Sequence, residues 1–334
     1  PSRGRACAAS PGGAGAARDT ISFSSMHRLD LRRATLLHAV PSANGASFPS
    51  VRALPFLLAL AIASLLAQPT LRALRVGGHT RPNYRGRELP CPLGVLIVLA
   101  ALLALVPLTL VERVGHTEIL YPGLVPVAVY ALGVACLGLI DDTLGSPRDG
   151  VTAPRGWRGH GASALRGELS TGTLKALGSL GLALLVLDFT GMSVGRWLLA
   201  AAVLVLATNA LNLLDLRPGR AFKVFVLIGA GLTIGARELR PLWTLGLFLG
   251  PALVAGAYDL REEAMLGDTG ANLLGALAGL WMVLILSQTG QLIALALLVI
   301  VTIYGELSSI SELVARVPLL RELDSFGRPS SPPR

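Results

Sequence analysis

The sequence predicts an all-α, polytopic integral membrane helix bundle. Hydrophobic residues make up 52% of the 334-residue chain, charged residues only 15%, and the mean hydropathy is +0.63. Soluble domains are nearer a quarter charged. Nearly uncharged windows of about 16 to 21 residues recur along the chain, as in membrane-spanning helices. This composition excludes a soluble enzyme, a disordered chain and a disulfide scaffold, and the 5% aromatic content argues against an outer-membrane barrel.

Nine apolar segments carry the pattern, and each is expected to form one transmembrane helix. The polar segments between them have no sustained apolar periodicity and are expected to be loops. The nine segments are residues 53–68, 92–111, 123–140, 173–188, 196–212, 222–236, 241–257, 270–287 and 291–311.

Basic residues decide the predicted orientation of these helices. The polar segments alternate between a long or basic set and a short set. The first set, with the adjacent Lys175, holds 18 Lys and Arg residues, and the second, with the adjacent Arg196, holds four. The positive-inside rule therefore places the first set in the cytoplasm, and it explains the net charge of +9 without a nucleic-acid partner. The first set is residues 69–91, 141–172, 213–223, 258–269 and 312–334, so the last of these is predicted to be a cytoplasmic tail.

Residues 1–50 differ from the rest of the chain. They carry six arginines, are rich in Ala, Ser, Gly and Pro, and show no sustained periodicity. Their scattered basic residues, without an apolar core close behind, do not fit a signal peptide. We interpret them as an N-terminal extension, either translated from a mis-assigned upstream start or a disordered tail. The transmembrane domain is expected over residues 51–311.

Carboxylates avoid the predicted helices and gather at their cytoplasmic ends. The adjacent Asp141 and Asp142 end the third segment in GLIDD, and Asp268 precedes the eighth in LGDTG. One acid alone would be explained as a solvated loop residue. Two adjacent like charges usually need a cation, however, and glycines beside an acid let backbone amides approach a ligand closely. Hard oxygen ligands without a Cys or His cluster favour Mg²⁺ or Mn²⁺ over zinc. The oxygen-bearing candidates are Asp141, Asp142, Asn209, Asn212, Asp215 and Asp268.

Basic side chains are predicted on the same membrane face. Lys175, one of only two lysines, lies just inside the fourth segment, and RPNYRGRELP supplies Arg81, Asn83 and Arg87 as substrate-binding candidates. A metal, carboxylates and cations at one face suit a diphosphate substrate, although each Arg alone could equally anchor lipid headgroups. Glu306 is the one carboxylate well inside a segment. Either a proton-relay role or an ion pair with a neighbour would explain it.

Five motifs, in this order, resemble those of the polyprenyl-phosphate N-acetylhexosamine-1-phosphate transferases. GLIDD, NALNLLD and MLGDTGANLLG carry most of the resemblance, while RPNYRGRELPCPLG and LRGELSTGTLKALG resemble the family's first two cytoplasmic loops. The resemblance covers roughly residues 55–310. This family includes the phospho-N-acetylmuramoyl-pentapeptide transferases of peptidoglycan synthesis and the UDP-N-acetylglucosamine–undecaprenyl-phosphate transferases.

The resemblance implies a Mg²⁺-dependent enzyme with its active site at the cytoplasmic face of the bacterial cytoplasmic membrane. It would transfer a sugar-1-phosphate from a UDP-sugar to undecaprenyl phosphate and release UMP, for peptidoglycan or another envelope polysaccharide. A homodimer is compatible with it. By position, Asp141 and Asp142 match the pair implicated in binding the metal and lipid phosphate, Asp268 matches a metal ligand, and Lys175 matches a lysine of the second loop. The nucleotide-site motif is matched by Asn209, Asn212 and Asp215.

Two other functions stay open at this stage. A transporter would also have many spans, but transporters place polar sites near the midplane, whereas these polar residues lie at one surface. A non-catalytic homologue that binds the lipid carrier or the UDP-sugar is the second alternative. It remains open because residues 312–328 lack the histidine-rich motif usual in the family's last cytoplasmic loop.

Overall fold

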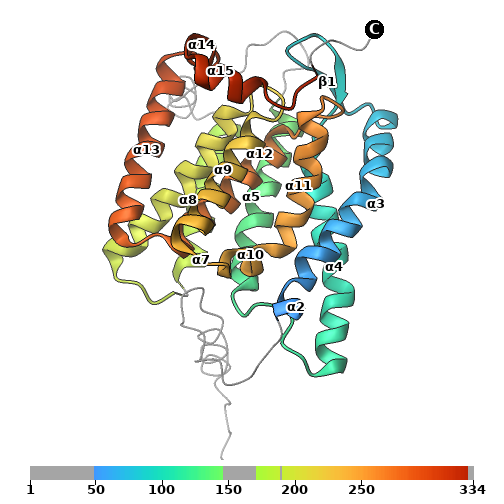
Figure 1. The fold of residues 1–334 in the computed structure, drawn as a ribbon, viewed down its shortest axis with the longest axis vertical. Helices are drawn as coiled ribbons and strands as arrows, with labels where there is room; N and C mark the ends of the chain where they lie inside the picture. Colours follow the sequence, from blue (N-terminus) through green and yellow to red (C-terminus); the bar gives the residue numbers. More distant parts are fainter. Residues whose placement is uncertain (1–48, 146–170, 189, 330–334) are drawn as a thin grey trace, which may run out of the picture.

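The computed structural model describes residues 49–145, 171–188 and 190–329 (Figure 1). Most of this part of the chain is helical, which confirms the all-α prediction. The expected extension over residues 1–50 lies almost wholly outside it. The helices are α2 (Pro49–Arg52), α3 (Leu54–Val76), α4 (Gly94–Gly115), α5 (Leu124–Leu144), α7 (Thr171–Asp188), α8 (Val194–Leu214), α9 (Arg220–Ala236), α10 (Arg240–Thr244), α11 (Gly246–Leu260), α12 (Gly267–Ile285), α13 (Gln288–Leu307), α14 (Ile310–Arg316) and α15 (Pro318–Ser325).

Seven of the described helices are long and apolar enough to cross a membrane, namely α3, α4, α5, α7, α8, α12 and α13. The two other predicted spans are also helices, but α9 has 17 residues and α11 has 15. At 1.5 Å per residue they rise only about 25 and 22 Å, less than the roughly 30 Å of the hydrocarbon core. A polytopic helix bundle is therefore what the structure has, with seven candidate spans in its described part, while the count of nine stays a prediction.

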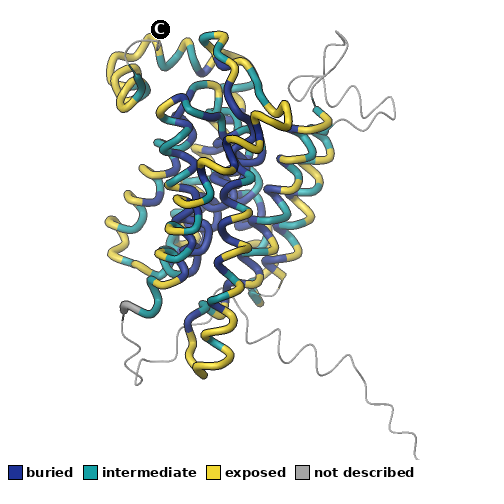
Figure 2. Tube along the Cα trace, turned by 90° about the vertical axis from the view of Figure 1, so that its right-hand side faces the viewer, coloured by how far each residue is buried: buried dark blue, intermediate teal, exposed yellow. Residues whose placement is uncertain are grey.

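Helix α12 forms the centre of the bundle. It is buried along most of its length and packs against α8, α5, α9 and α4. Figure 2 shows the buried interior of the bundle in dark blue. Glycines at the helix crossings allow this close packing. A Cβ on Gly94 of α4 would collide with the backbone of Gly270 on α12, and a Cβ on Gly275 of α12 would collide with the backbone of Thr208 on α8. Small residues at crossings are the usual means of close helix packing in membranes. This packing fixes the start of α12, and Asp268 with it.

The outer helices present apolar side chains to the surroundings. Most of α13 and α7 is not buried, and exposed residues such as Leu297, Ile300 and Leu177 lie on them. In water such a surface would be an aggregation hazard, whereas in a bilayer it is the lipid-facing side.

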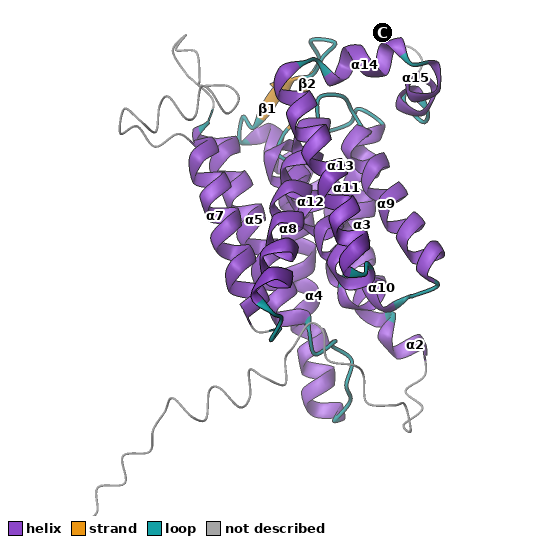
Figure 3. Cartoon of the chain, turned by 90° about the vertical axis from the view of Figure 1, so that its left-hand side faces the viewer, coloured by secondary structure: helices purple, strands orange, loops and turns teal. Residues whose placement is uncertain are grey.

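One end of the bundle carries polar structure that the sequence did not predict. Residues 80–90, expected to be a plain loop, form the antiparallel pair β1 (Thr80–Pro82) and β2 (Glu88–Pro90), with Arg81 opposite Leu89. The Asn83 side chain shapes the turn, since its Oδ1 accepts from the backbone N–H groups of Arg85 (2.9 Å) and Arg87 (3.0 Å). Helices α14 and α15 cross the same end, which we call the hairpin end (Figures 1 and 3).

Candidate functional site

A cavity of about 430 Å³ opens at the hairpin end, between the end of α8, the start of α12 and the α13–α14 junction. Four of the predicted site residues line it: Arg81, Asn212, Asp215 and Asp268. They come from segments far apart in the sequence, so the prediction that these segments meet at one end of the bundle agrees with the geometry.

A lysine and two carboxylates form the core of the site. Lys175 Nζ of α7 lies 2.7 Å from Asp141 Oδ2 of α5 and 3.5 Å from Asp268 Oδ2 of α12. Asn212 of α8 joins them: in the amide orientation that satisfies both contacts, its nitrogen donates to Asp268 Oδ1 (2.7 Å) and its oxygen accepts from Lys175 Nζ (3.2 Å). Asp268 is the most exposed of the charged three, with 33% of its side chain accessible, against 18% for Lys175 and 15% for Asp141. Its carboxylate is thus the one most available to a ligand in the cavity.

Asp142 is placed differently from its neighbour Asp141. Its fully buried carboxylate accepts from the backbone N–H groups of Asp268 (3.1 Å) and Thr269 (2.8 Å) and from the Thr269 hydroxyl (2.7 Å). These donors belong to the first turn of α12, where unpaired N–H groups and the helix dipole attract an anion. Arg81 approaches from the hairpin, with Nη1 3.3 Å from Asp142 Oδ1 and Nη2 donating to the Asp142 carbonyl oxygen. Asp142 therefore joins α5, α12 and the hairpin into one unit.

The donor set of the core fits a hard divalent cation. Among the described residues no group of three or more His, Cys, Asp or Glu side chains is close enough to hold a metal ion by itself. Mg²⁺ does not require one, because it typically takes one or two protein carboxylates and completes its shell with water and substrate phosphate oxygens. Asp268, Asp141 and the Asn212 amide oxygen could supply the protein's share. Asp141, Asp142 and Asp268 also outnumber Lys175 and Arg81, so the site has a deficit of positive charge.

Asp215 follows the last turn of α8 and lines the same cavity. Burial raises the pKa of this carboxyl well above its usual range, and the negative charges of Asp259, Asp268 and Asp142 add to the effect. A bound cation or hydrogen-bond donor would stabilise the ionised form of such a carboxyl. Carboxyl groups with a shifted pKa are common at functional sites.

Three predicted site residues lie elsewhere. Asn209 donates to the hydroxyl of Thr302 on α13 (3.3 Å), one turn deeper in the bundle than Asn212. Asn83 builds the hairpin turn, and Arg87 Nη1 lies 3.5 Å from Glu262 Oε2. None of the three lines the 430 Å³ cavity. Glu306 is half-buried near the end of α13.

Sequence reasoning missed Glu262, whose side chain is wholly buried between α11 and α12. Besides Arg87, it contacts Arg85 Nη2 (3.5 Å), the Tyr84 hydroxyl (3.2 Å) and Asn83 Nδ2 (3.4 Å). Its backbone has a positive φ of 57°, unusual for a residue other than glycine. In RELPC and LREEAM nothing distinguishes this acid from a solvated one, because only the fold brings the hairpin to it.

Ion pairs and hydrogen bonds hold the C-terminal segment over the site. We call the contacts that Arg220, Lys223 and Arg328 make with Asp324 and the end of α15 the latch. Arg220, at the start of α9, donates from Nε and Nη2 to the two carboxylate oxygens of Asp324 on α15 (2.8 and 3.2 Å), and Arg328 adds a third contact (2.7 Å). Lys223 donates to backbone carbonyls at the end of α15, those of Leu323 (3.0 Å) and Phe326 (3.1 Å) among them. This latch holds the segment whose residues 308–310 line the cavity.

We expect the latch to loosen when Asp324 loses its charge. Burial raises the pKa of Asp324, but the hydrogen bonds and charges of Arg220 and Arg328 outweigh it and leave the pKa below its usual value. A lowered folded-state pKa stabilises the docked form above the ordinary Asp pKa of about 3.9, and this contribution is lost as the pH falls through the lower value. Asp324→Asn should reproduce the loss at neutral pH, weakening docking by about 2 kcal/mol.

Hydrogen exchange of α15 amides measures this docking. Glu312→Gln is the matched control, because the Glu312–Arg316 pair is exposed at both residues and contributes little. Unchanged protection of α15 in Asp324→Asn would show that the latch does not hold the segment.

Comparison with known proteins does not identify a family for this chain. No protein-family model matches the chain, and no curated protein matches it.

Proposed function

We propose that this protein transfers a sugar-1-phosphate from a UDP-sugar to a polyprenyl phosphate and releases UMP. The observation that carries the proposal is the cluster of Asp268, Asp141, Lys175 and Asn212. Asp268 and Asn212 of this cluster line the 430 Å³ cavity, and the other two contact Asp268 or each other behind them. It combines hard oxygen donors with a cation at the polar end of an apolar bundle, where a water-soluble nucleotide and a lipid phosphate can meet. The motif resemblance described above supports the same reaction.

The proposed step is a direct displacement. An oxygen of the polyprenyl phosphate attacks the β-phosphorus of the UDP-sugar, and the bond from that phosphorus to the bridging oxygen breaks, so UMP leaves with the electron pair. Phosphate monoesters are largely ionised at neutral pH, with a second pKa of about 6, so the step needs no strong base. Cys91 also lines the cavity, but burial raises the pKa of its thiol far above neutral pH, which makes a cysteine-bound intermediate unfavourable.

In this proposal each residue of the cluster has a separate role. Asp268 and Asp141 would hold Mg²⁺, with the Asn212 amide beside them, and the ion would offset the charge of the diphosphate oxygens. Lys175 keeps the two carboxylates in place and offers a positive charge to a phosphate. Arg81 lines the cavity and gives the lipid phosphate or diphosphate a second cation. Positioning and charge neutralisation would supply most of the rate.

The membrane setting follows from the same proposal. The hairpin end carries many arginines, and the positive-inside rule therefore supports a cytoplasmic position for it, on the side where UDP-sugars are made. We propose a bacterial cytoplasmic membrane protein with this end inside, nine spans including α9 and α11, and a role in peptidoglycan or another envelope polysaccharide. A homodimer is compatible with the exposed apolar helices.

A transfer assay on the full chain in detergent tests the function. The assay contains undecaprenyl phosphate, Mg²⁺ and a panel of UDP-sugars, and UMP release is the readout. We expect release with at least one sugar, dependent on the lipid phosphate and abolished by EDTA. Folded protein that binds UDP-sugar without releasing UMP would instead favour the non-catalytic alternative.

A further inference from the structure

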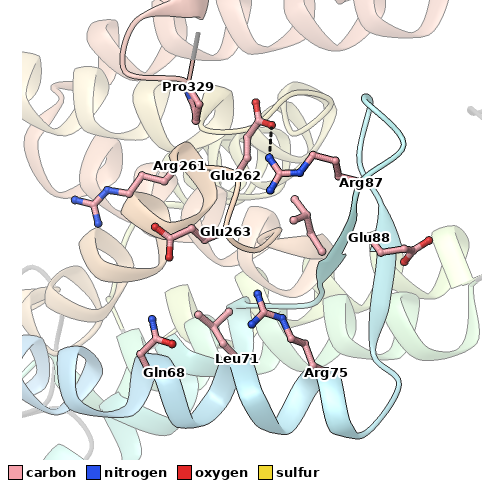
Figure 4. Close-up of a pocket in the computed structure, with 10 residues that line it drawn as sticks. Gln68, Leu71, Arg75, Arg87, Glu88, Arg261, Glu262, Glu263 and Pro329 are labelled. Carbon is pink, nitrogen blue, oxygen red and sulfur yellow. Dashed lines mark ion pairs between the residues drawn. The ribbon is translucent and has the colours of Figure 1, made fainter. Parts of the chain in front are cut away.

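A second cavity borders the same hairpin and is larger than the first, at about 550 Å³ (Figure 4). Its walls come from the last turns of α3, the second half of the hairpin and the loop between α11 and α12. No residue lines both cavities, so the second one is a separate space and does not belong to the proposed transferase site.

Charges of both signs line this cavity, and only some of them are paired. Arg87 forms an ion pair with the buried Glu262, drawn in Figure 4, and Arg85 contacts the same carboxylate. In the described part of the chain, Arg75 and Arg261 form no ion pair, and neither does Glu263. Figure 4 shows Arg75 rising from α3 into the space below the loop that carries Glu263. Unpaired guanidinium and carboxylate groups in one cavity suit a ligand that carries both a negative and a positive group.

The position of the cavity relates it to the bilayer surface. Helix α3 is a candidate span, and Arg75 lies in its last turn, where an apolar helix reaches the headgroup region. One turn earlier, the buried Leu71 gives the cavity an apolar wall. Deeper still, Gln68 Nε2 donates to the Tyr258 hydroxyl of α11 (3.3 Å), so a polar contact joins the two helices beneath the opening. Such a cavity has charged groups at the headgroup level, an apolar wall beside them at Leu71 and a polar contact at its deeper end.

We propose that this cavity binds the zwitterionic headgroup of a phospholipid that carries a phosphate and a primary ammonium group. Arg75 would donate charge-assisted hydrogen bonds to the phosphate, and Glu263 would accept from the ammonium. Arg261 would add positive charge at the rim of the cavity. An anionic headgroup without an amine would satisfy the arginines and leave the Glu263 carboxylate facing negative charge. Free phosphate would lack both the amine and the apolar part that Leu71 contacts. The proposal does not depend on the reaction assigned to the first cavity.

Native mass spectrometry of the delipidated full chain tests this site. The protein is offered equal amounts of phosphatidylethanolamine and phosphatidylglycerol, with phosphatidylcholine and inorganic phosphate in separate arms. We expect phosphatidylethanolamine to bind best, because its ammonium retains N–H donors that phosphatidylcholine lacks. Arg75→Gln should weaken this binding about tenfold, the effect of losing one charge-assisted hydrogen bond. Glu263→Gln should remove the preference over phosphatidylglycerol.

Arg72→Gln is the matched control, since Arg72 is an exposed arginine on the same helix that does not line the cavity. Arg75 is also exposed and Glu263 half-buried, so neither variant should unfold the protein, and thermal unfolding checks this. Equal binding of the two lipids by the unmodified protein would overturn the proposal. So would an equal loss in Arg72→Gln, or displacement of the lipid by inorganic phosphate.

Discussion

Asp268→Asn is expected to abolish most UMP release while leaving the fold intact. The substitution keeps the size of the side chain and an oxygen that can still accept from Asn212, but it removes the charge that would hold a divalent cation at the cavity. Loss of one such electrostatic group typically lowers turnover about 100- to 1000-fold. The fold should tolerate the change, because Asp268 is one-third exposed and Lys175 keeps its shorter contact with Asp141.

Two measurements on this variant separate chemistry from folding. UMP release is followed against Mg²⁺ concentration, and thermal unfolding is followed in the same detergent. Raising Mg²⁺ should not restore the variant, since the missing group is a ligand. Asp188→Asn is the matched control, because Asp188 is an exposed carboxylate at the other end of α7. This variant should change neither UMP release nor the temperature of unfolding. Full activity in Asp268→Asn would refute the metal assignment.

Hydropathy predicted the helices well because the bilayer imposes a simple requirement on them. All nine apolar segments are helical, since a chain in hydrocarbon has to satisfy its backbone hydrogen bonds within each helix. Whether each helix spans is less certain from pattern alone: α11 contains Pro251, follows the separate short helix α10 and has only 15 residues. The hairpin was missed because three-residue strands carry no periodic signal.

Site residues were predictable as a group but not individually. Asn209 and Asn212 are three residues apart, a spacing that puts two side chains on one face of a helix. Helix α13 nevertheless packs beside α8 and contacts Asn209, while Asn212 contacts Asp268. Asp215 does line the cavity, but as the residue that ends the helix. Spacing gives the side of a helix on which a residue lies, and the neighbouring helix then decides its contact.

The adjacent Asp141 and Asp142 show this limit most clearly. Successive residues of an α-helix point about 100° apart, so two neighbouring aspartates cannot share one contact surface. The sequence predicted one shared role for them. In the structure Asp141 pairs with Lys175 beside Asp268, and Asp142 is buried against the first turn of α12.

We therefore expect the two alanine substitutions to affect different properties: Asp142→Ala mainly the stability of the fold, and Asp141→Ala mainly the release of UMP. Asp142→Ala removes three hydrogen bonds to the start of α12 and the ion pair with Arg81. A hydrogen bond to a charged group is typically worth about 1.5–3 kcal/mol, so Asp142→Ala should lower the temperature of unfolding strongly. Asp141→Ala removes a partly exposed contact with Lys175 and should cost less stability, but it should lower UMP release by a large factor because a proposed cation ligand is lost.

Hydrogen exchange gives the Asp142 prediction a local readout besides overall stability. The backbone amides of Asp268 and Thr269 donate to Asp142, so they should lose protection in Asp142→Ala and keep it in Asp141→Ala. Asp142→Asn should fall between the unmodified protein and Asp142→Ala, because the amide retains one acceptor oxygen but no charge. If Asp142→Ala unfolds no earlier than Asp141→Ala and its amides stay protected, Asp142 does not hold α12. The two aspartates would then share the role that their adjacency in the sequence first indicated.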